Sequence, residues 1–229
     1  MTAPQPADAR NQMVTEQVAN RGITDVAVLA AMRAVPREAF VPENLRKSAY
    51  RDGPLPIGYG QTISQPYMVA AMISHLALQP DEQVLEIGTG CGYAAAVLAN
   101  IVERVHTVER IPQLALQARQ HLANLGLSRV NVHVGDGTTG LIEHAPFDAI
   151  VVAASGPVVP EPLKRQLGIG GRLVVPVGRT PKSQQLVRVT RRRPTDFVTE
   201  TLGGVRFVPL IGSNAWQDDS WRMPNRLRR

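Results

Sequence analysis

From Gln83 onward, short apolar runs alternate with stretches of helical spacing, and this alternation constrains the fold more than any other feature. Buried strands of a parallel sheet covered by helices on both faces are typically built in this way. We expect two further strands at 185–190 and 197–208, at least one of them antiparallel. The predicted sheet strands lie at 84–87, 105–108, 130–134, 149–153 and 173–177, and helices at about 92–101, 112–125 and 160–167.

The first 80 residues follow a different pattern. Residues 11–20 have helical spacing that stops at Arg21-Gly22, and Thr24 is placed to cap a second helix that ends before Pro36. Residues 53–66 are rich in glycine and proline, and Pro66 suits the first position of a third helix. The sequence therefore predicts a doubly wound α/β domain with an N-terminal helical extension.

The formal charge of +6 comes from 25 basic and 19 acidic residues, but its distribution is uneven. Without eight clustered arginines, 17 basic residues would face 19 acidic ones. The basicity therefore belongs to an expected turn between strands and to the C-terminal end. A solvated turn and chain end is one interpretation, and a phosphate-binding surface is the other. The eight are Arg188, Arg191, Arg192, Arg193, Arg222, Arg226, Arg228 and Arg229.

Other features exclude whole classes of protein. The single cysteine, Cys91, excludes a disulfide framework and a cysteine-based zinc site, and we interpret it as a small loop residue without a neighbouring histidine. The N-terminus has no basic-then-apolar export signal, and no apolar run approaches the length of a membrane helix. The histidines lack paired metal-ligand spacing. We expect a cytoplasmic protein that needs no metal.

A glycine-rich segment, Glu86-Ile87-Gly88-Thr89-Gly90-Cys91-Gly92, ends the first sheet strand and opens a helix. Glycines there permit a tight turn and the close approach of a ligand. The spacing G-x-G-x-G differs from the dinucleotide fingerprint, and no lysine makes it a phosphate-binding loop. Glu86 beside the loop suits a cationic ligand, and S-adenosylmethionine carries both an ammonium and a sulfonium.

Two more acidic positions follow the next two strands. Glu109 can accept hydrogen bonds from both hydroxyls of a ribose, and Asp136-Gly137 can contact an adenine edge. Each acid alone is also compatible with a solvated loop residue or a helix cap. Acids at the ends of three successive strands, however, meet at one edge of the sheet. The sequence thus predicts a methyl-donor site.

Several segments resemble the protein-L-isoaspartate O-methyltransferase family over roughly residues 11–212. The Thr62-Ile63-Ser64 segment before the glycine loop separates this family from methyltransferases in general. Cys91 replaces an expected serine, and the end of the chain lacks a firm match. The resembling segments are 35–42, 60–70, 84–93, 135–138, 147–150, 170–178 and 205–210.

The resemblance implies methyl transfer from S-adenosylmethionine to the free carboxylate of L-isoaspartyl residues in damaged proteins and peptides, with S-adenosylhomocysteine as the other product. The methyl ester then closes to a succinimide, which begins repair. The resemblance assigns catalysis to Ser64. From the residues we expect no metal, no membrane partner and no nucleic acid partner, and we expect a monomeric enzyme. Implied donor-binding positions are Thr62, Ser64, Glu86, Gly88, Gly90, Gly92, Glu109, Asp136 and Gly137.

The resemblance also suggests a division of the chain within a single structural domain and a Rossmann-like class I methyltransferase sheet. Residues 1–80 form a helical extension with a loop on the substrate and donor side, and 81–212 form the methyltransferase domain. Residues 213–229 form a Trp/Arg-rich tail. In some family members the segment after the last strand closes over the donor, and Gln217 is the position in question here.

The acceptor chemistry leaves two roles open for Ser64. A carboxylate is already ionised at neutral pH, so it needs alignment rather than a strong base. The Ser64 hydroxyl can hold one carboxylate oxygen while the other attacks, or it can merely cap the helix that begins at Pro66. The peptide is expected to bind as an extended backbone near Tyr59, Gly60 and Val208.

Three other functions compete with this one. A nucleic-acid methyltransferase fits the basic pI of about 10.1, but the segment at 152–157 lacks the Pro-Pro-aromatic motif of base-amine methylation. A non-catalytic binding module would be expected to have lost catalytic or donor-site residues, whereas the candidate residues Thr62, Ser64, Glu86, Glu109 and Asp136 are all present. A dinucleotide oxidoreductase requires a different glycine spacing.

Overall fold

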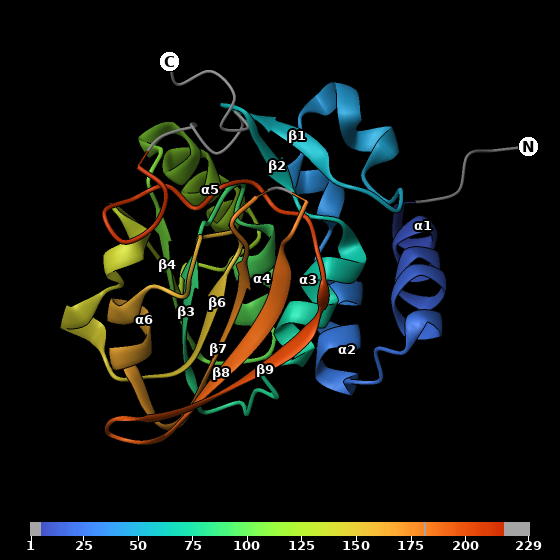
Figure 1. The fold of residues 1–229 in the computed structure, drawn as a ribbon. Helices are drawn as coiled ribbons and strands as arrows, with labels where there is room; N and C mark the ends of the chain where they lie inside the picture. The colour runs from blue at the N-terminus through green and yellow to red at the C-terminus, as the bar shows by residue number, and fades with distance from the viewer. Residues whose placement is uncertain (1–5, 181, 218–229) are drawn as a thin grey trace, which may run out of the picture.

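Seven strands form one sheet in the order β5-β4-β3-β6-β7-β8-β9 (Figure 1). The computed structural model describes residues 6–180 and 182–217. Strands β3 to β7 are parallel, and β8 and β9 pair antiparallel to their neighbours. The strands are β3 (Gln83–Ile87), β4 (Arg104–Glu109), β5 (Val130–Val134), β6 (Phe147–Val152), β7 (Leu167–Val177), β8 (Gln185–Arg193) and β9 (Asp196–Gly204).

All seven sheet strands expected from the sequence are present, with different ends. The strand expected at 173–177 begins earlier, because Leu167 pairs with Phe147 ahead of a register shift. The strand expected to reach residue 208 ends at Gly204. Beyond it, Phe207 donates its N–H at 2.6 Å to the buried side chain of Gln184, the residue before β8, in place of a strand ladder.

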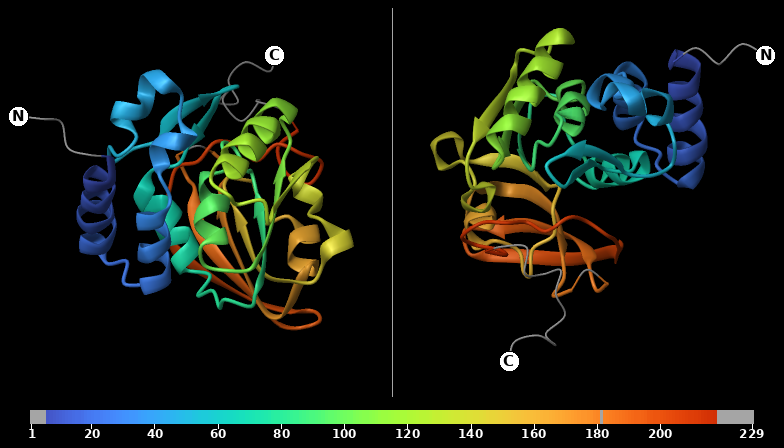
Figure 2. Two further views of the ribbon diagram at one scale, coloured as in Figure 1. Left: turned by 180° about the vertical axis from the view of Figure 1, so that it is seen from behind. Right: turned by 90° about the horizontal axis from the view of Figure 1, so that it is seen from above.

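Helices cover both faces of the sheet (Figure 2). Residues of α3, α4 and α5 share one core with Val84, Val105 and Val174, and the N-terminal helices pack outside α3 and α4 on that side. On the opposite face, Leu163 of α6 packs in a second core with Leu85. The helices are α1 (Pro6–Gln12), α2 (Val26–Ala34), α3 (Pro66–Ser74), α4 (Tyr93–Ala99), α5 (Pro112–Asn124) and α6 (Glu161–Arg165).

The N-terminal region contains two local differences from expectation. The helix expected at 11–20 is split into α1, a π-helical turn η1 (Met13–Val18) and a 3-10 turn η2 (Ala19–Arg21). The cap of α2 is Asp25 rather than Thr24, since the Asp25 carboxylate accepts the Val28 N–H at 3.1 Å. A carboxylate at this position satisfies an otherwise unpaired helix donor.

A short hairpin, β1 (Leu55–Gly58) and β2 (Gln61–Ile63), leads into α3. Core residues from Met13 to Phe207 belong to one continuous cluster, which is compatible with a single structural domain. The finer division at residues 80 and 212 stays a prediction, and residues 218–229 of the expected tail lie outside the described part. Within the described residues, no helix has the length and apolar character needed to cross a membrane.

Candidate active site

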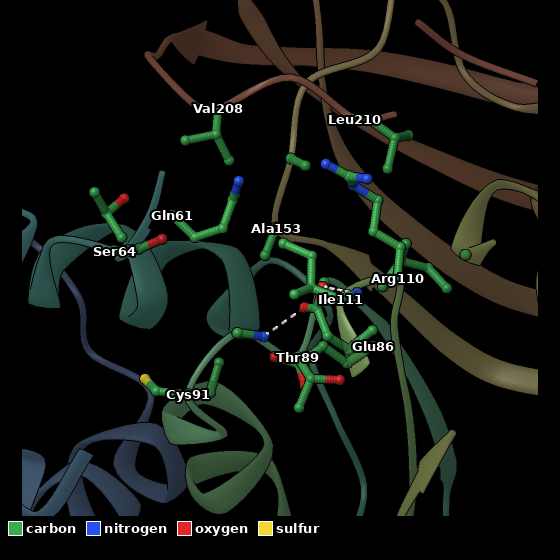
Figure 3. Close-up of a pocket in the computed structure, with 18 of the residues that line it drawn as sticks. Gln61, Ser64, Glu86, Thr89, Cys91, Arg110, Ile111, Ala153, Val208 and Leu210 are labelled. Carbon is green, nitrogen blue, oxygen red and sulfur yellow. Dashed lines mark hydrogen bonds between the residues drawn. The ribbon is translucent and has the colours of Figure 1, made fainter. Parts of the chain in front are cut away.

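A pocket opens at the carboxyl ends of β3, β4 and β6, and the strand order reverses between β3 and β6 (Figure 3). Ligands of doubly wound sheets bind at this point, because the loops diverge to either side of it. The pocket wall includes eight of the predicted residues: Thr62, Ser64, Glu86, Gly88, Gly90, Glu109, Gly137 and Val208.

The glycine loop has the backbone that its residues predict. Gly88, Gly90 and Gly92 have φ values of +92°, +54° and +92°, which residues with a side chain rarely adopt. Gly88 and Gly90 line the pocket. Gly92 instead packs behind the loop, where a Cβ would lie 3.3 Å from the Ala118 Cβ of α5. Gly92 thus shapes the loop without lining the pocket.

Glu109 lies at the end of β4 with its carboxylate held in place. One oxygen accepts the Gly90 N–H at 2.9 Å, and the other accepts the Ile111 N–H at 3.0 Å (Figure 3). Each carboxylate oxygen has a second lone pair. The fixed carboxylate therefore retains acceptor capacity for a pair of ligand hydroxyls in the pocket.

Glu86 is almost completely buried at the base of the pocket. The Thr107 hydroxyl donates to Glu86 at 2.6 Å, and Thr107 in turn bonds the Thr89 hydroxyl at 2.6 Å. Burial raises the pKa of Glu86 to about 8, even though the Thr107 hydrogen bond opposes that shift. A cationic ligand beside this carboxyl would favour its ionised form.

Asp136 does not line the pocket, although Gly137 does. One Asp136 oxygen accepts the Thr138 N–H and hydroxyl, and the other accepts the Ser213 N–H at 2.7 Å and hydroxyl at 2.8 Å. These four bonds lower the pKa of Asp136 against the effect of burial. The carboxylate fastens the C-terminal loop to the sheet, and its predicted contact with adenine stays a prediction.

Ser64 lies between β2 and α3, half-buried, and does not cap the helix. The N-cap of α3 is Gln65, and among the described residues no side chain makes a capping hydrogen bond to this helix. The Ser64 carbonyl accepts a 2.7 Å hydrogen bond from Arg37. Arg37 is fully buried, and it also donates to the Ala49 carbonyl at 2.8 Å. The buried guanidinium of Arg37 therefore holds the backbone around Ser64 in position.

A second, more open groove adjoins the pocket at Ser64. Thr62, Ser64, Ala153 and Val208 line both cavities. Tyr59 and Gly60, which were predicted to contact the substrate, line neither, and the Tyr59 side chain in the hairpin turn is 54% exposed. Further groove residues are Arg21, Gln65, Lys182, Gln184, Val205, Arg206 and Phe207.

Sequence reasoning overlooked several residues that surround these cavities. Gln61, Thr89, Arg110 and Ile111 line the pocket, and Arg110 extends toward the loop that carries Leu210 (Figure 3). These four residues could have been predicted from the sequence, because each is adjacent to a predicted site residue or lies in the same loop as one. Arg21, 43 positions from Ser64 in the chain, could not have been predicted in this way.

Cys91 is buried, and burial raises the pKa of its thiol to about 11. A thiol in that state is a poor nucleophile. The fold brings His121 beside it, contrary to the sequence-based expectation of no neighbouring histidine, but the imidazole contacts the Cys91 carbonyl at 2.9 Å rather than the sulfur. Cys91 therefore acts as a small loop residue.

A model of the family described as protein-L-isoaspartate(D-aspartate) O-methyltransferase matches residues 8–215. The chain belongs to this family. A protein-L-isoaspartate O-methyltransferase from Pelobacter propionicus is 58% identical over 207 residues, covering 90% of this chain and 92% of its own. One from Rhodopseudomonas palustris strain HaA2 is 59% identical over 210 residues, covering 92% and 86%.

Solved structures agree with this assignment. A protein-L-isoaspartate O-methyltransferase structure superposes with a TM-score of 0.81 at 28% identity and covers 90% of this chain and 67% of its own. A candidate member from Plasmodium falciparum, in complex with S-adenosyl-L-homocysteine, gives 0.76 at 26% identity and covers 88% and 98%. The predicted family, enzyme class and Rossmann-like methyltransferase fold are thereby confirmed.

Proposed function

We propose that this isoaspartyl methyltransferase transfers the methyl group of S-adenosylmethionine to the free carboxylate of L-isoaspartyl residues, with Ser64 as the residue that holds the carboxylate. The observation that supports this role is the position of Ser64, which lines both the donor pocket and the adjoining groove. A hydroxyl at that junction can reach donor and peptide together. Because it does not cap α3, it is available for the substrate.

The polar groups of the donor pocket suit S-adenosylmethionine. Glu109 has lone pairs for the ribose hydroxyls, the glycine loop allows close backbone approach, and buried Glu86 suits the ammonium end. Bound S-adenosylmethionine supplies an electrophilic methyl group on a positive sulfur. Thr62, Gly88, Gly90 and Gly137 complete the proposed donor wall.

The groove provides cations for an anionic acceptor. Lys182 and Arg206 lie along it, as does Arg21, which is paired with Asp52 at 3.2 Å. The positive charge of Lys182 and Arg206 draws an isoaspartyl residue with its free carboxylate toward Ser64. The carboxylate is ionised at neutral pH and needs no base. Holding one oxygen on the Ser64 hydroxyl orients the other toward the methyl group, and alignment of this kind contributes about 7–11 kcal/mol in model reactions.

The products are a methyl ester and neutral S-adenosylhomocysteine, since the sulfonium loses its methyl and its charge together. The neighbouring backbone nitrogen then displaces methanol from the ester to form a succinimide. Water opens that ring, in part to normal aspartate. These last steps need no further residue of the enzyme, so the chain's task ends with the ester.

Three further properties remain part of the proposal. The enzyme acts as a monomer in the cytoplasm, and its partners are isoaspartyl proteins and peptides rather than nucleic acid. The groove between Tyr67 and Val205 supports a peptide partner, because extended backbone can bind along it.

Labelled methyl transfer to paired isoaspartyl and aspartyl peptides tests the proposal. We expect base-labile label on the isoaspartyl peptide only, and a Ser64→Ala variant with kcat/KM reduced roughly 10- to 100-fold, the effect of losing one hydrogen bond to a charged group. Ser74→Ala, at the far end of α3, serves as the control. Full activity in Ser64→Ala would exclude the proposed role, and equal labelling of both peptides would exclude the acceptor.

A further inference from the structure

Three histidines that are scattered in the sequence meet on the α6 side of the sheet. His106 comes from β4, His133 from the edge strand β5, and His144 from the 3-10 turn η6 (Ile142–His144). One ring nitrogen from each residue lies within 4.8 Å of the others. His106 Nδ1 lies 3.2 Å from His133 Nε2.

These separations suit a shared metal ion. Two nitrogens that bind zinc tetrahedrally at about 2.0–2.1 Å lie about 3.3 Å apart, close to the His106–His133 separation. His144 completes a triangle, with its ring centroid 4.3 Å from that of His106 and 5.4 Å from that of His133. A small movement of one exposed side chain would bring all three nitrogens into coordination distance.

The surroundings also fit a site of this kind. His106 is buried and packs edge-on against Phe147, whereas His144 is exposed, so an ion can enter and keep water as a further ligand. The backbone of His144 is held by Gln83, whose side chain donates to the His144 carbonyl at 2.5 Å. Glu143 places a negative charge near His133, which favours a bound cation. Arg104 near His106 and Arg119 near His133 place positive charges there, which disfavour one.

We propose that His106, His133 and His144 bind one divalent late first-row transition ion, with Zn²⁺ as the physiological candidate. Imidazole ligands suit this class of metal and disfavour Mg²⁺ and Ca²⁺. The ion would clamp β5 and η6 to β4. The site is separate from the donor pocket, because none of the three histidines lines it, so methyl transfer itself does not require the ion.

The test uses the full chain without a histidine tag, freed of metal by chelation. Co²⁺ is the spectroscopic probe, and we expect one equivalent to bind with visible d–d absorption bands, displaced by Zn²⁺. Zn²⁺ should raise the thermal unfolding midpoint, whereas Mg²⁺ should not. His144→Gln and His133→Gln, both at solvent-accessible positions, should each weaken Co²⁺ binding at least about tenfold, because even outer-shell changes cost that much.

His75→Gln, which changes a histidine outside the cluster, should bind Co²⁺ like the unaltered chain. Absence of a stoichiometric Co²⁺ spectrum at millimolar Co²⁺ would overturn the proposal. Equal Co²⁺ affinity in His144→Gln, His133→Gln and His75→Gln would overturn it as well. Methyl transfer by the chelated protein is expected to persist, and this readout separates the metal site from the proposed function.

Discussion

At the scale of single residues, burial changes what an acidic side chain can do. Glu86 is read from the sequence as an anion beside a cationic donor, yet the fold encloses it so fully that its pKa rises to about 8. The ligand-free protein therefore holds a proton there at neutral pH. The unfolded chain, with a carboxyl pKa near 4.5, does not.

This difference predicts a pH-dependent stability. Because Glu86 has the higher pKa in the folded state, the native protein binds the extra proton, and its contribution to stability is complete below about pH 4.5 and lost as pH rises toward about 8. A Glu86→Gln variant keeps an acceptor for Thr107 but cannot ionise. As the pH rises from about 4.5 to about 8, the unaltered protein should lose unfolding free energy relative to Glu86→Gln.

Chemical denaturation of both proteins at pH 5, 6, 7 and 8, without donor, measures the difference. The other titrating groups cancel in the comparison. A constant difference would show that Glu86 ionises normally.

In the presence of donor, Glu86→Gln should bind S-adenosylmethionine more weakly, since the carboxylate opposite the ammonium is gone.

Arg37 is important because it holds the backbone around Ser64 in position. Its guanidinium donates to the carbonyls of Ala49 and Ser64 and lies 4.9 Å from the Tyr93 ring centroid, so it joins the N-terminal extension to α4 and to the Ser64 segment. Burial lowers its pKa. Since lysine cannot span both carbonyls with a planar fork, Arg37→Lys should displace Ser64.

We expect Arg37→Lys to lower kcat about tenfold or more, because misplacement by even 1 Å is costly in catalysis. The dissociation constant of S-adenosylhomocysteine should stay within about twofold, since the carbonyl of Ser64 is not part of the proposed donor contacts. Arg33→Lys, on the exposed side of α2, is the control. A parallel loss of donor affinity and kcat would indicate general unfolding of the site instead of displacement of Ser64.

At the scale of elements, the loop after residue 208 completes the pocket. Its Pro209, Leu210 and Ile211 line the cavity, and the loop is attached through Ser213 to Asp136 and through Trp216 to the Ser155 carbonyl at 3.1 Å. The loop thus contacts the segments that follow β5 and β6. Donor affinity should depend on how closely this loop lies against the sheet.

Gly212 tests that dependence. A Cβ at this position would lie 2.1 Å from the Asp136 Oδ1, so in Gly212→Ala either the loop or the Asp136 side chain must shift, and the contact between Asp136 and Ser213 is disturbed. Overpacking of this kind costs about 1–3 kcal/mol, and we expect roughly tenfold weaker donor binding by calorimetry. Gly53→Ala, where a Cβ meets nothing within 4 Å, is the control. Unchanged donor binding in Gly212→Ala would remove the loop from the donor site.

At the scale of the whole molecule, the basic cluster before residue 194 is partly used within the fold. Arg188 lies inside β8 rather than in a turn, and its guanidinium pairs with Glu200 at 2.6 Å. Arg191 donates to the carbonyls of Arg165 and Leu167. These two arginines hold strands and α6 together, which weakens the interpretation of the cluster as a phosphate-binding surface.

The C-terminal end yields a prediction at the same scale. Truncation after Gln217 keeps the Ser213 and Trp216 contacts, whereas truncation after Gly212 removes both. We expect donor affinity within about twofold for the first variant and at least about tenfold weaker for the second, consistent with the loss of several hydrogen bonds. If both truncations weaken donor binding equally, residues beyond Gln217 contribute to the site. Gln217 itself is exposed, and its closure over the donor stays a prediction.

Local sequence patterns were sufficient to predict the alternation of strands and helices, the glycine loop, the ends of the strands that carry Glu86 and Glu109, and the family. These features depend on neighbouring residues and on local backbone preferences, so they can be read along the chain. Local reading was less reliable at element ends, because the end of β9 depends on the distant Gln184 and the register of β7 on Phe147.

Which groups from distant parts of the chain meet could be seen only in the folded protein. Arg37 reaches Ser64, Ser213 reaches Asp136, and three histidines from separate elements converge, although nothing in their spacing indicates it. Burial likewise decided that Glu86 holds its proton and that Cys91 is unreactive. The physical reason is that contacts and desolvation depend on the packing of the whole chain, whereas sequence patterns report mainly on neighbours along it.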